Sequence, residues 1–391
     1  MQRKLRMGMV GGGKGAFIGA VHRMAAQLDG LIELCCGVFS SNAARSLESG
    51  RELMLPDDRV YGSHLEMIQS ERMLPDHQRM DFVAIVTPND QHYPVARLAL
   101  QHGFHVVCDK PMTLNLDEAV ALERIVAATG LEFALTHNYT GYPLVKEARH
   151  LVEIEALGRI RKVVVEYPQG WLATRLEAEG QKQASWRTDP KRAGASCCMG
   201  DIGTHAANLA EYITGLDIAE VCADLTTFVA GRPLEDDGNV LLRFDGGARG
   251  VLTASQVSID DENGLAIRIY GERGGLEWRQ EEPNTLIHKQ LGAPRQILRA
   301  GVNHTRLSKA ALHNTRLPGG HPEGYIEAFA NVYRNFALTL AARAVGRTAT
   351  AEERDFPGAR EGVRGMAFIA AVVESAHSAQ KWVRIPELQM R

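Results

Sequence analysis

Three short segments of this chain carry residue types that could do chemistry together. Residues 9–19 read MVGGGKGAFIG, a glycine-rich turn directly after an apolar run. The tripeptide Asp109-Lys110-Pro111 ends a later apolar run, and GDIGTH follows much further along at residues 200–205. A glycine-rich turn can hold dinucleotide phosphates, while a lysine, an aspartate and a histidine can move a proton beside a hydride acceptor. Their order and spacing predict a nicotinamide-dependent oxidoreductase.

The first segment has the form of a dinucleotide-phosphate turn. Gly11, Gly13 and Ala16 satisfy the pattern G-x-G-x-x-A, with Lys14 inside the turn. Glycines are needed where a tight turn must let the backbone approach a pyrophosphate, and the following helix then points its N-terminal amides at the phosphates. We therefore expect these four residues to bind the cofactor. The alternative is a plain glycine-rich connection.

The end of the second apolar run bears on the choice between NAD and NADP. A carboxylate about 20 residues beyond the glycine turn would bind the ribose 2′-hydroxyl of NAD. Here Ser40 and Ser41 occupy that point, with Arg45 close behind and no carboxylate. Hydroxyl and guanidinium donors suit a 2′-phosphate at least as well. The sequence thus favours NADP, although Arg45 fits a solvated helix position equally.

The other two segments supply candidates for proton transfer. Lys110 follows a predicted parallel strand, and ligands of such sheets bind at the carboxyl ends of the strands. Asp201 and His205 are four residues apart at the start of a helical pattern, which places them on one face. An aspartate can hold one imidazole nitrogen as N–H and leave the other free as the base that alcohol oxidation requires. The alternatives are an exposed lysine and a structural Asp–His hydrogen bond, and a zinc site lacks an evident third ligand.

The apolar runs predict two domains. In residues 1–138, short strand-like runs alternate with helical patterns, which predicts an α/β domain with a doubly wound parallel sheet. In residues 139–391, consecutive strand-like runs separated by turn signals predict an α+β domain with a large, open, mostly antiparallel sheet. A long loop is expected at residues 290–318. The outer face of such a sheet needs cover, which a second subunit would supply.

Composition narrows the class of protein. The 391 residues are 45% hydrophobic and 23% charged, which is ordinary for a globular protein. A net charge of −3 offers no electrostatic footprint for nucleic acid or an anionic membrane, and no apolar run reaches the length of a membrane span. The N-terminal residues lack the apolar stretch and cleavage site of a signal peptide, so a cytoplasmic location is expected.

The cysteines give no sign of chemistry by their spacing. The 6 cysteines include two adjacent pairs, Cys35-Cys36 and Cys197-Cys198, but no C-x-x-C pattern. This spacing argues against a zinc site or a redox motif, so we expect most of them to behave as small buried hydrophobes and expect no metal.

Together the three segments resemble those of the glucose-fructose oxidoreductase, inositol dehydrogenase and rhizopine catabolism (Gfo/Idh/MocA) family, and the resemblance covers essentially the whole chain. The family's Glu-Lys-Pro motif stands here as Asp109-Lys110-Pro111, and its D-x-G-x-H motif matches at Asp201, Gly203 and His205. The family opening usually runs G-x-G-x-x-G-x-x-H. If Gly19 and His22 are its last two members, the loop here is three residues longer, which makes Gly11 and Gly13 firmer assignments than Ala16 or Gly19.

The resemblance implies a Rossmann domain that binds NAD(P), followed by a domain that binds substrate and joins subunits into a homodimer or homotetramer. It implies that Lys110 contacts substrate and cofactor, that His205 is the acid/base, and that Asp201 is its neighbour and a substrate ligand. The segment AIVTPNDQHYPVA is similar to the family's nucleotide-contacting strand end. The further cofactor contacts implied are Thr87, Pro88, Asn89, His92, Asp109 and Lys110. The substrates implied are sugars, sugar derivatives and cyclitols with a reacting secondary hydroxyl.

Five more residues are candidates for substrate contact, each with an equally good structural interpretation: Asn138, Tyr139, Trp186, Arg187 and His321. Trp186 offers an apolar face to a sugar ring, and Arg187 offers several hydrogen-bond donors.

Two other functions stay open at this point. One is a glycosidase or lyase that uses tightly held NAD for transient sugar oxidation, although Ala206, Ala207 and Asn208 stand where a further histidine would then be expected. The other is a non-catalytic regulator that senses NAD(P), which the presence of both Lys110 and His205 disfavours.

Overall fold

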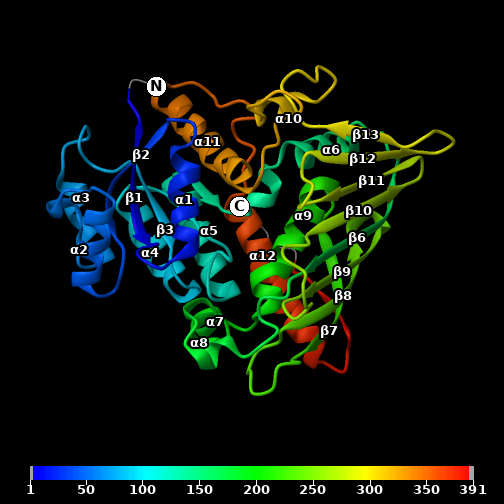
Figure 1. Ribbon diagram of the computed structural model, residues 1–391, viewed down its shortest axis with the longest axis horizontal. Helices are drawn as coiled ribbons and strands as arrows, with labels where there is room; N and C mark the ends of the chain where they lie inside the picture. The colour runs from blue at the N-terminus through cyan, green and yellow to red at the C-terminus, as the bar shows by residue number, and fades with distance from the viewer. Residues whose placement is uncertain (1–2, 387–391) are drawn as a thin grey trace. The chain divides into compact units, whose positions relative to one another are not determined.

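A five-stranded parallel sheet organises the first unit of the computed structural model, which describes residues 3–386 (Figure 1). The strand order is β2-β1-β3-β4-β5, and every neighbouring pair is parallel. The strands are β1 (Leu5–Gly11), β2 (Ile32–Val38), β3 (Phe82–Val86), β4 (His105–Cys108) and β5 (Phe133–Leu135). The order reverses between β1 and β3, and the carboxyl ends of strands at such a switch point form the ligand-binding edge. The predicted doubly wound parallel sheet is confirmed.

Helices connect these strands and cover the sheet. They are α1 (Phe17–Gln27), α2 (Ala43–Glu52), α3 (His64–Met73), α4 (His92–Gln101) and α5 (Leu116–Thr129). The sequence specifies the ends of α5 clearly. The Asn115 side chain accepts the Glu118 N–H at 2.9 Å as the N-cap, and Gly130 ends the helix with a φ of 60°.

A helix from far along the chain completes this unit. Helix α11 (Tyr325–Ala344) packs beside α1 and buries Phe329, Tyr333 and Phe336 in the same core as Phe82 of β3 (Figure 1). The chain accordingly divides into one unit that ends at Asn138 and takes back Tyr325–Val363, and another that holds Tyr139–Gly324 and resumes at Arg364. This division differs from a single boundary after residue 138, because the apolar face of α11 fills the core of the parallel sheet.

The second unit is built on a nine-stranded sheet of order β13-β12-β11-β10-β6-β9-β8-β7-β14. Its neighbours are antiparallel except for β6 and β9, which run parallel, so the predicted mostly antiparallel open sheet is confirmed. The strands are β6 (Ile160–Pro168), β7 (Ile218–Thr226), β8 (Asp237–Phe244), β9 (Arg249–Ser255), β10 (Ala266–Gly271), β11 (Gly274–Arg279), β12 (Thr285–Gln290), β13 (Gln296–Arg299) and β14 (Trp382–Arg384).

One face of this sheet is covered by helices. Helices α6 (Pro143–Glu153) and α9 (Thr204–Thr214) pack against each other and against strands of the sheet. Burial alternates along β8, because one face of the sheet packs against the core and the other is open. Val240 and Leu242 are buried, whereas Leu241 between them is 49% exposed. The remaining helices are α7 (Lys182–Arg187), α8 (Pro190–Ala193), α10 (Lys309–His313) and α12 (Ala359–His377).

The predicted long loop at residues 290–318 is wrong in part, because it contains β13 and α10. Both elements are short, and β13 is an edge strand with mostly exposed side chains. Neither therefore produces a periodic pattern of apolar residues that the sequence could reveal. Over the described residues 3–386, no helix combines the length and the apolar character needed to cross a bilayer.

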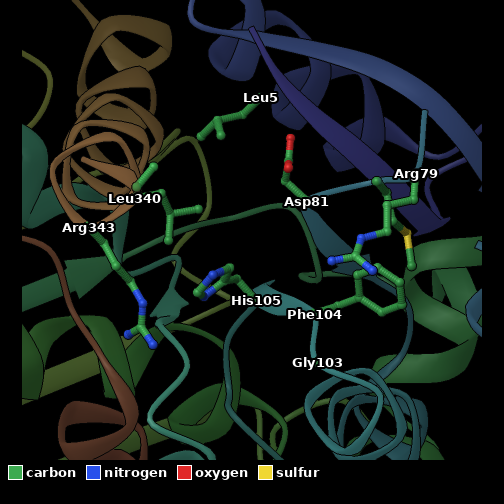
Figure 2. A pocket seen from close by; sticks show the side chains of 10 residues that line it. Leu5, Arg79, Asp81, Gly103, Phe104, His105, Leu340 and Arg343 are labelled. Carbon is green, nitrogen blue, oxygen red and sulfur yellow. The ribbon is translucent and has the colours of Figure 1, made fainter. Parts of the chain in front are cut away.

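A pocket of about 360 Å³ lies at the amino-terminal edge of the parallel sheet, opposite the ligand-binding edge (Figure 2). His105 stands between the Arg79 and Arg343 side chains in this view. Its Nδ1 accepts the Glu132 N–H at 2.9 Å. Burial, together with the charge of Arg343, lowers the pKa of His105 to about 4.

This histidine makes stability depend on pH. A histidine in an unfolded chain has a pKa of about 6.5. Between pH 6.5 and 4, His105 is therefore protonated in the unfolded chain and neutral in the folded one. The stability from neutral His105 is therefore present above about pH 6.5 and is lost as the pH falls towards 4. We expect wild type to lose about 1–2 kcal/mol more than His105→Asn between pH 7 and pH 5. Denaturant unfolding of both proteins at the two pH values measures this, and equal losses would contradict it.

Candidate active site

The glycine-rich turn between β1 and α1 runs where side chains cannot fit. Gly11 has a φ of 87°, and a Cβ there would lie 2.2 Å from the Val86 carbonyl oxygen of the neighbouring β3. A Cβ on Gly13 would lie 2.5 Å from the carbonyl oxygen of Phe39, at the end of β2. The turn is thus pressed against the ends of both neighbouring strands, which leaves its backbone bare towards the ligand-binding edge.

A later glycine allows the helix to approach this turn. A Cβ on Gly19 would lie 2.4 Å from the Gly12 Cα, so α1 packs directly on backbone there. Ala16 instead occupies the N-cap position of α1, and its N–H bonds the Gly13 carbonyl at 3.0 Å. The structure therefore gives the helix-packing role of the third small residue to Gly19. The sequence contained a signal for this role, because Gly19 matches the last glycine of the family opening G-x-G-x-x-G-x-x-H if the loop is three residues longer.

Lys14 turns its side chain to the protein. Its ammonium group contacts Glu52 at 2.7 Å and Glu48 at 2.9 Å, both on α2. Hydrogen bonds to Glu52 and Glu48 raise the pKa of Lys14, so it stays charged. This lysine links the turn to α2 through exposed ion pairs.

The end of β2 presents hydroxyls and a guanidinium. Ser40 Oγ accepts the Asn42 N–H at 3.2 Å, and Asn42 in turn caps α2 by accepting the Arg45 N–H at 3.0 Å. Ser41 and Arg45 are exposed, and the first turn of α2 contains no acidic residue. The exposed Ser41 hydroxyl and Arg45 guanidinium are therefore hydrogen-bond donors at this strand end.

His92 connects the loops that follow β3 and β4 through hydrogen bonds to their backbone. The imidazole is 1% exposed, with Nδ1 2.7 Å from the Pro111 carbonyl oxygen and Nε2 2.9 Å from the Thr87 carbonyl oxygen. The Thr87 hydroxyl is buried with no hydrogen-bond partner among the described residues, and Pro88 and the buried Asn89 follow it. These residues form the part of the edge that adjoins Gly11 of β1.

Asp109 anchors the backbone of Lys110. Its Oδ1 accepts the Lys110 N–H at 3.0 Å and the Thr136 hydroxyl at 2.6 Å, and lies 3.9 Å from His22 Nε2. Burial alone would raise the pKa of Asp109, but His22, the Lys110 charge and Thr136 hold it well below its usual range. Asp109 is therefore a carboxylate that fixes where Lys110 leaves the strand.

Two residues near Lys110 were missed by the sequence reasoning. His22 Nδ1 lies 2.7 Å from the hydroxyl of Tyr333 on α11, so a distant helix orients the ring beside Asp109. His137 follows β5, and burial together with the Lys110 charge lowers its pKa to about 3. The family opening contained a signal for His22, whereas nothing in the local pattern marked His137.

The second unit holds a separate polar cluster around Asp201. Asp201 lies in a π-helical turn (Met199–Gly203) that leads into α9, where His205 occupies the first turn. Asp201 Oδ2 accepts Arg187 Nε at 3.1 Å and Gln256 Nε2 at 2.9 Å. The His205 ring meets the Tyr139 ring edge-on, with centroids 4.8 Å apart. The structure thus joins Tyr139, Arg187, Asp201 and His205 in one unit.

Aromatic rings frame this cluster. The Arg187 guanidinium lies 4.3 Å from the Trp186 ring centroid and 5.8 Å from that of Trp171. Gln256, which follows β9, and Trp171 were not predicted, because no local motif contains them. His321 lies outside these contacts, in the exposed loop before α11, and Asn138 closes the first unit after β5.

Comparison with known proteins assigns the family. The model described as "Oxidoreductase family, NAD-binding Rossmann fold" matches residues 5–137, and the model described as "GFO/IDH/MocA C-terminal domain" matches residues 145–277. The chain belongs to the Gfo/Idh/MocA oxidoreductase family. The N-terminal match overlies the glycine turn and Lys110, and the C-terminal match overlies Asp201 and His205.

Individual relatives are similar to this chain over nearly its full length. The uncharacterized oxidoreductase YfiI of Bacillus subtilis is 31% identical, over 98% of this chain and 97% of its own. An inositol dehydrogenase homolog from Azotobacter vinelandii, solved with NAD⁺, is 35% identical with a TM-score of 0.91, covering 98% of this chain and 97% of the other. An oxidoreductase from Sinorhizobium meliloti is 43% identical with a TM-score of 0.87, covering 98% and 100%. The chain is accordingly a dehydrogenase.

The contact between Gly19 and Gly12 yields a testable prediction. Gly19→Ala places a methyl group against backbone that cannot move aside, at a cost of about 1–3 kcal/mol. The displaced helix start would also weaken cofactor binding, by about tenfold or more. Unfolding curves and cofactor titrations measure the two effects, with Ala20→Ser, an exposed neighbour in α1, as the matched control. Wild-type behaviour of Gly19→Ala would show that this close approach is dispensable.

Proposed function

We propose that this dehydrogenase reversibly oxidises a secondary hydroxyl of a sugar, sugar derivative or cyclitol, with NAD(P) as the hydride acceptor. In this proposal the first unit binds the cofactor and the second binds the substrate. The observation that carries it is the cluster in the second unit, where Asp201 and His205 lie with Arg187 and two tryptophan rings. Convergent polar groups beside aromatic faces suit a polyhydroxylated ring.

A relative with a defined ligand supports the substrate class. The Azotobacter vinelandii inositol dehydrogenase homolog was also solved with NADH and myo-inositol, at 34% identity and a TM-score of 0.89. Its ligand is a cyclitol with only secondary hydroxyls. Because the identity extends over 98% of both chains, a substrate of this kind is the first to test.

The residues of the first unit fit a dinucleotide. The bare backbone at Gly11 and Gly13 leaves room for a pyrophosphate, and the buried Thr87 hydroxyl has a free hydrogen-bonding capacity that a bound ligand would use. The bound nicotinamide supplies the hydride acceptor. Asp109 holds the Lys110 backbone at the same edge, so the ammonium group can donate to the substrate oxygen as negative charge develops on it.

The second unit supplies the proton acceptor. Removal of a hydride from a carbinol carbon requires loss of the hydroxyl proton, and His205 takes that proton in oxidation and returns it in reduction. Arg187 and Gln256 both donate to Asp201 Oδ2, and these two hydrogen bonds fix the direction of the carboxylate. Asp201 is therefore held in place to orient the substrate in this proposal.

Steady-state kinetics tests the proposal. Rates of NAD and NADP reduction are measured separately against free sugars, glycosides and inositols, for wild type, Lys110→Ala and His205→Asn. Loss of the general base is expected to lower kcat about 10²–10⁴-fold while cofactor affinity changes little. The control is His77→Asn, at an exposed position of the first unit. Turnover that survives both substitutions, or absence of turnover with tightly retained cofactor, would contradict the proposal and favour a bound-NAD hydrolase or a sensor.

We further propose that Ser40, Ser41 and Arg45 accept a 2′-phosphate, so that the enzyme prefers NADP. The support is the strand end described above, with exposed donors and no acid in the first turn of α2. Arg45→Ala is expected to raise the Kd for NADPH about tenfold, because one charge-assisted contact is lost, and to leave the Kd for NADH unchanged. Fluorescence titration measures both. An equal effect on the two cofactors, or none, would contradict this preference.

We also propose that the chain forms a homodimer or homotetramer through the open face of its nine-stranded sheet. That face carries cross-strand ion pairs, among them Lys289–Glu277 at 2.8 Å and Arg243–Glu220 at 2.9 Å, alongside the exposed Leu241. A second copy would cover the face that α6 and α9 leave open.

A further inference from the structure

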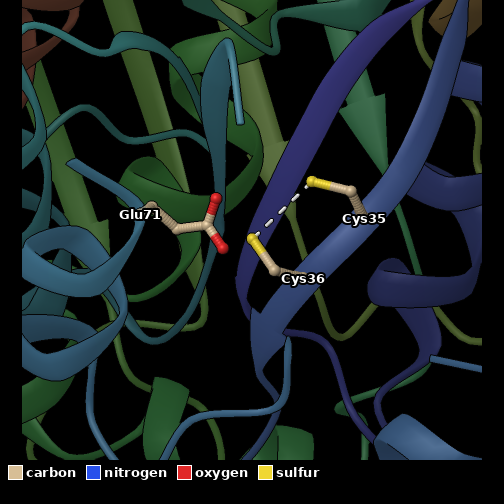
Figure 3. Close-up of side chains that lie close together, drawn as sticks. All are labelled: Cys35, Cys36 and Glu71. Atoms are coloured by element: carbon tan, nitrogen blue, oxygen red, sulfur yellow. Dashed lines mark hydrogen bonds between the residues drawn. The ribbon is translucent and has the colours of Figure 1, made fainter. Parts of the chain in front are cut away.

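A β-bulge in β2 brings two adjacent cysteines to the same place. The β1–β2 register pairs Met7 with Leu34 and then Gly8 with Cys36, so Cys35 is an extra residue in the ladder. Adjacent side chains of a regular strand point to opposite faces. Here the two Sγ atoms are only 3.8 Å apart (Figure 3). We expected no metal because the sequence has no C-x-x-C spacing, but the bulge brings two thiols together without that spacing.

The surroundings of the pair are buried and largely satisfied. Cys36 and Glu71 are 0% exposed, whereas Cys35 is half-buried, and Glu71 points its carboxylate towards Cys36 (Figure 3). The Glu71 oxygens accept both Arg59 donors at 3.0 Å, the Tyr61 hydroxyl at 2.9 Å and the Met80 N–H at 2.8 Å. The carboxylate is thus neutralised and fully hydrogen-bonded without help from the thiols.

Two further contacts reach the sulfur atoms. Arg59 Nη2 lies 3.6 Å from Cys35 Sγ, and Met80 Sδ lies 3.9 Å from Cys36 Sγ. A thioether is a ligand that soft ions accept. The cluster therefore has two thiols, one soft neutral donor and a nearby positive charge.

The spacing suits an ion better than a bond between the sulfurs. A disulfide needs an S–S distance of about 2.05 Å and a Cα separation of about 4.4–6.8 Å, whereas adjacent residues are held about 3.8 Å apart. Two thiolates on a tetrahedral ion with bonds of about 2.3 Å stand about 3.8 Å from each other. We propose that Cys35 and Cys36 form a binding site for a thiophilic divalent cation such as zinc, with Met80 on its inner side.

Charge balance selects a divalent ion. Two neutral thiols and one divalent cation give a neutral dithiolate complex and two protons released to solvent, so the buried cluster gains no net charge. A monovalent ion would leave one uncompensated negative charge beside the satisfied Arg59–Glu71 pair. Cys35 lies at the half-buried side, which gives the ion a path of entry and a remaining coordination position to solvent.

Occupancy would stiffen a strand that supports the glycine turn. Phe39, three residues beyond Cys36, has the carbonyl oxygen that a Cβ on Gly13 would meet at 2.5 Å. An ion at the bulge binds only the folded arrangement of β2, so it would stabilise the first unit by mass action.

The test uses the full-length chain without a tag, freed of metal by a chelator and kept reduced with a non-thiol reductant. Zinc is titrated in competition with a chromophoric chelator, and cadmium is followed by its thiolate charge-transfer absorption. We expect one ion per chain, a higher melting temperature with zinc, and an affinity about 100-fold lower in Cys35→Ser. Cys35 is half-buried, so this variant folds, which the melting temperature in chelator verifies. The matched control is Cys222→Ser, a half-buried cysteine of the second unit, which should bind like wild type.

Three results would overturn the site. Zinc binding of unchanged affinity in Cys35→Ser would place the ion elsewhere. Absence of binding by wild type with all thiols free would refute it outright. A purified chain whose mass and thiol count show a Cys35–Cys36 disulfide would mean that the bulge serves oxidation instead. None of these outcomes depends on the sugar dehydrogenase activity.

Discussion

Backbone packed on backbone is the constraint on which the first unit depends. A side chain at Gly11, Gly13 or Gly19 would meet the carbonyl of Val86, the carbonyl of Phe39 or the Gly12 Cα. A flexible side-chain tip could yield to an intruding methyl group, but the backbone of packed strands and helices cannot. The three contacts together fix the ends of β1, β2 and β3 relative to the start of α1, and that edge is where the cofactor of such a sheet binds.

The position of Lys110 depends on a second, polar layer of support. Burial would raise the pKa of Asp109, and its neighbours overcome this, so the residue remains a carboxylate that grips the Lys110 N–H. One neighbour, His22, is oriented by Tyr333 of α11, and the two residues are 311 positions apart in the sequence. The return of α11 to the first unit is thus part of how the site is held as well as part of its core.

The sequence revealed those features whose residues lie within a few positions of one another. The glycine turn, the strand-end lysine and the D-x-G-x-H segment each combine residue type and position within a few residues, and the parallel and antiparallel sheets follow from the rhythm of apolar runs. Gln256, Trp171 and the Tyr333–His22 contact depend on segments that meet only after folding, so no single stretch of sequence records them. The bulge at Cys35 is similar, since a one-residue register slip depends on the partner strand.

Contacts between distant segments also determine the surroundings of Asp201 in the second unit. The four-residue spacing predicted that Asp201 and His205 share one helical face, with the histidine as the base, but it gave no partners for the Asp201 carboxylate. Arg187, held against Trp186, and Gln256 both donate to one Asp201 oxygen, and the Gln256 amide is itself oriented by the Cys197 thiol, 3.5 Å from its Oε1. A guanidinium and an amide that both donate to one oxygen hold a carboxylate in a fixed direction. In the reaction proposed above, His205, which meets the Tyr139 ring edge-on, is the group that exchanges a proton with the substrate hydroxyl.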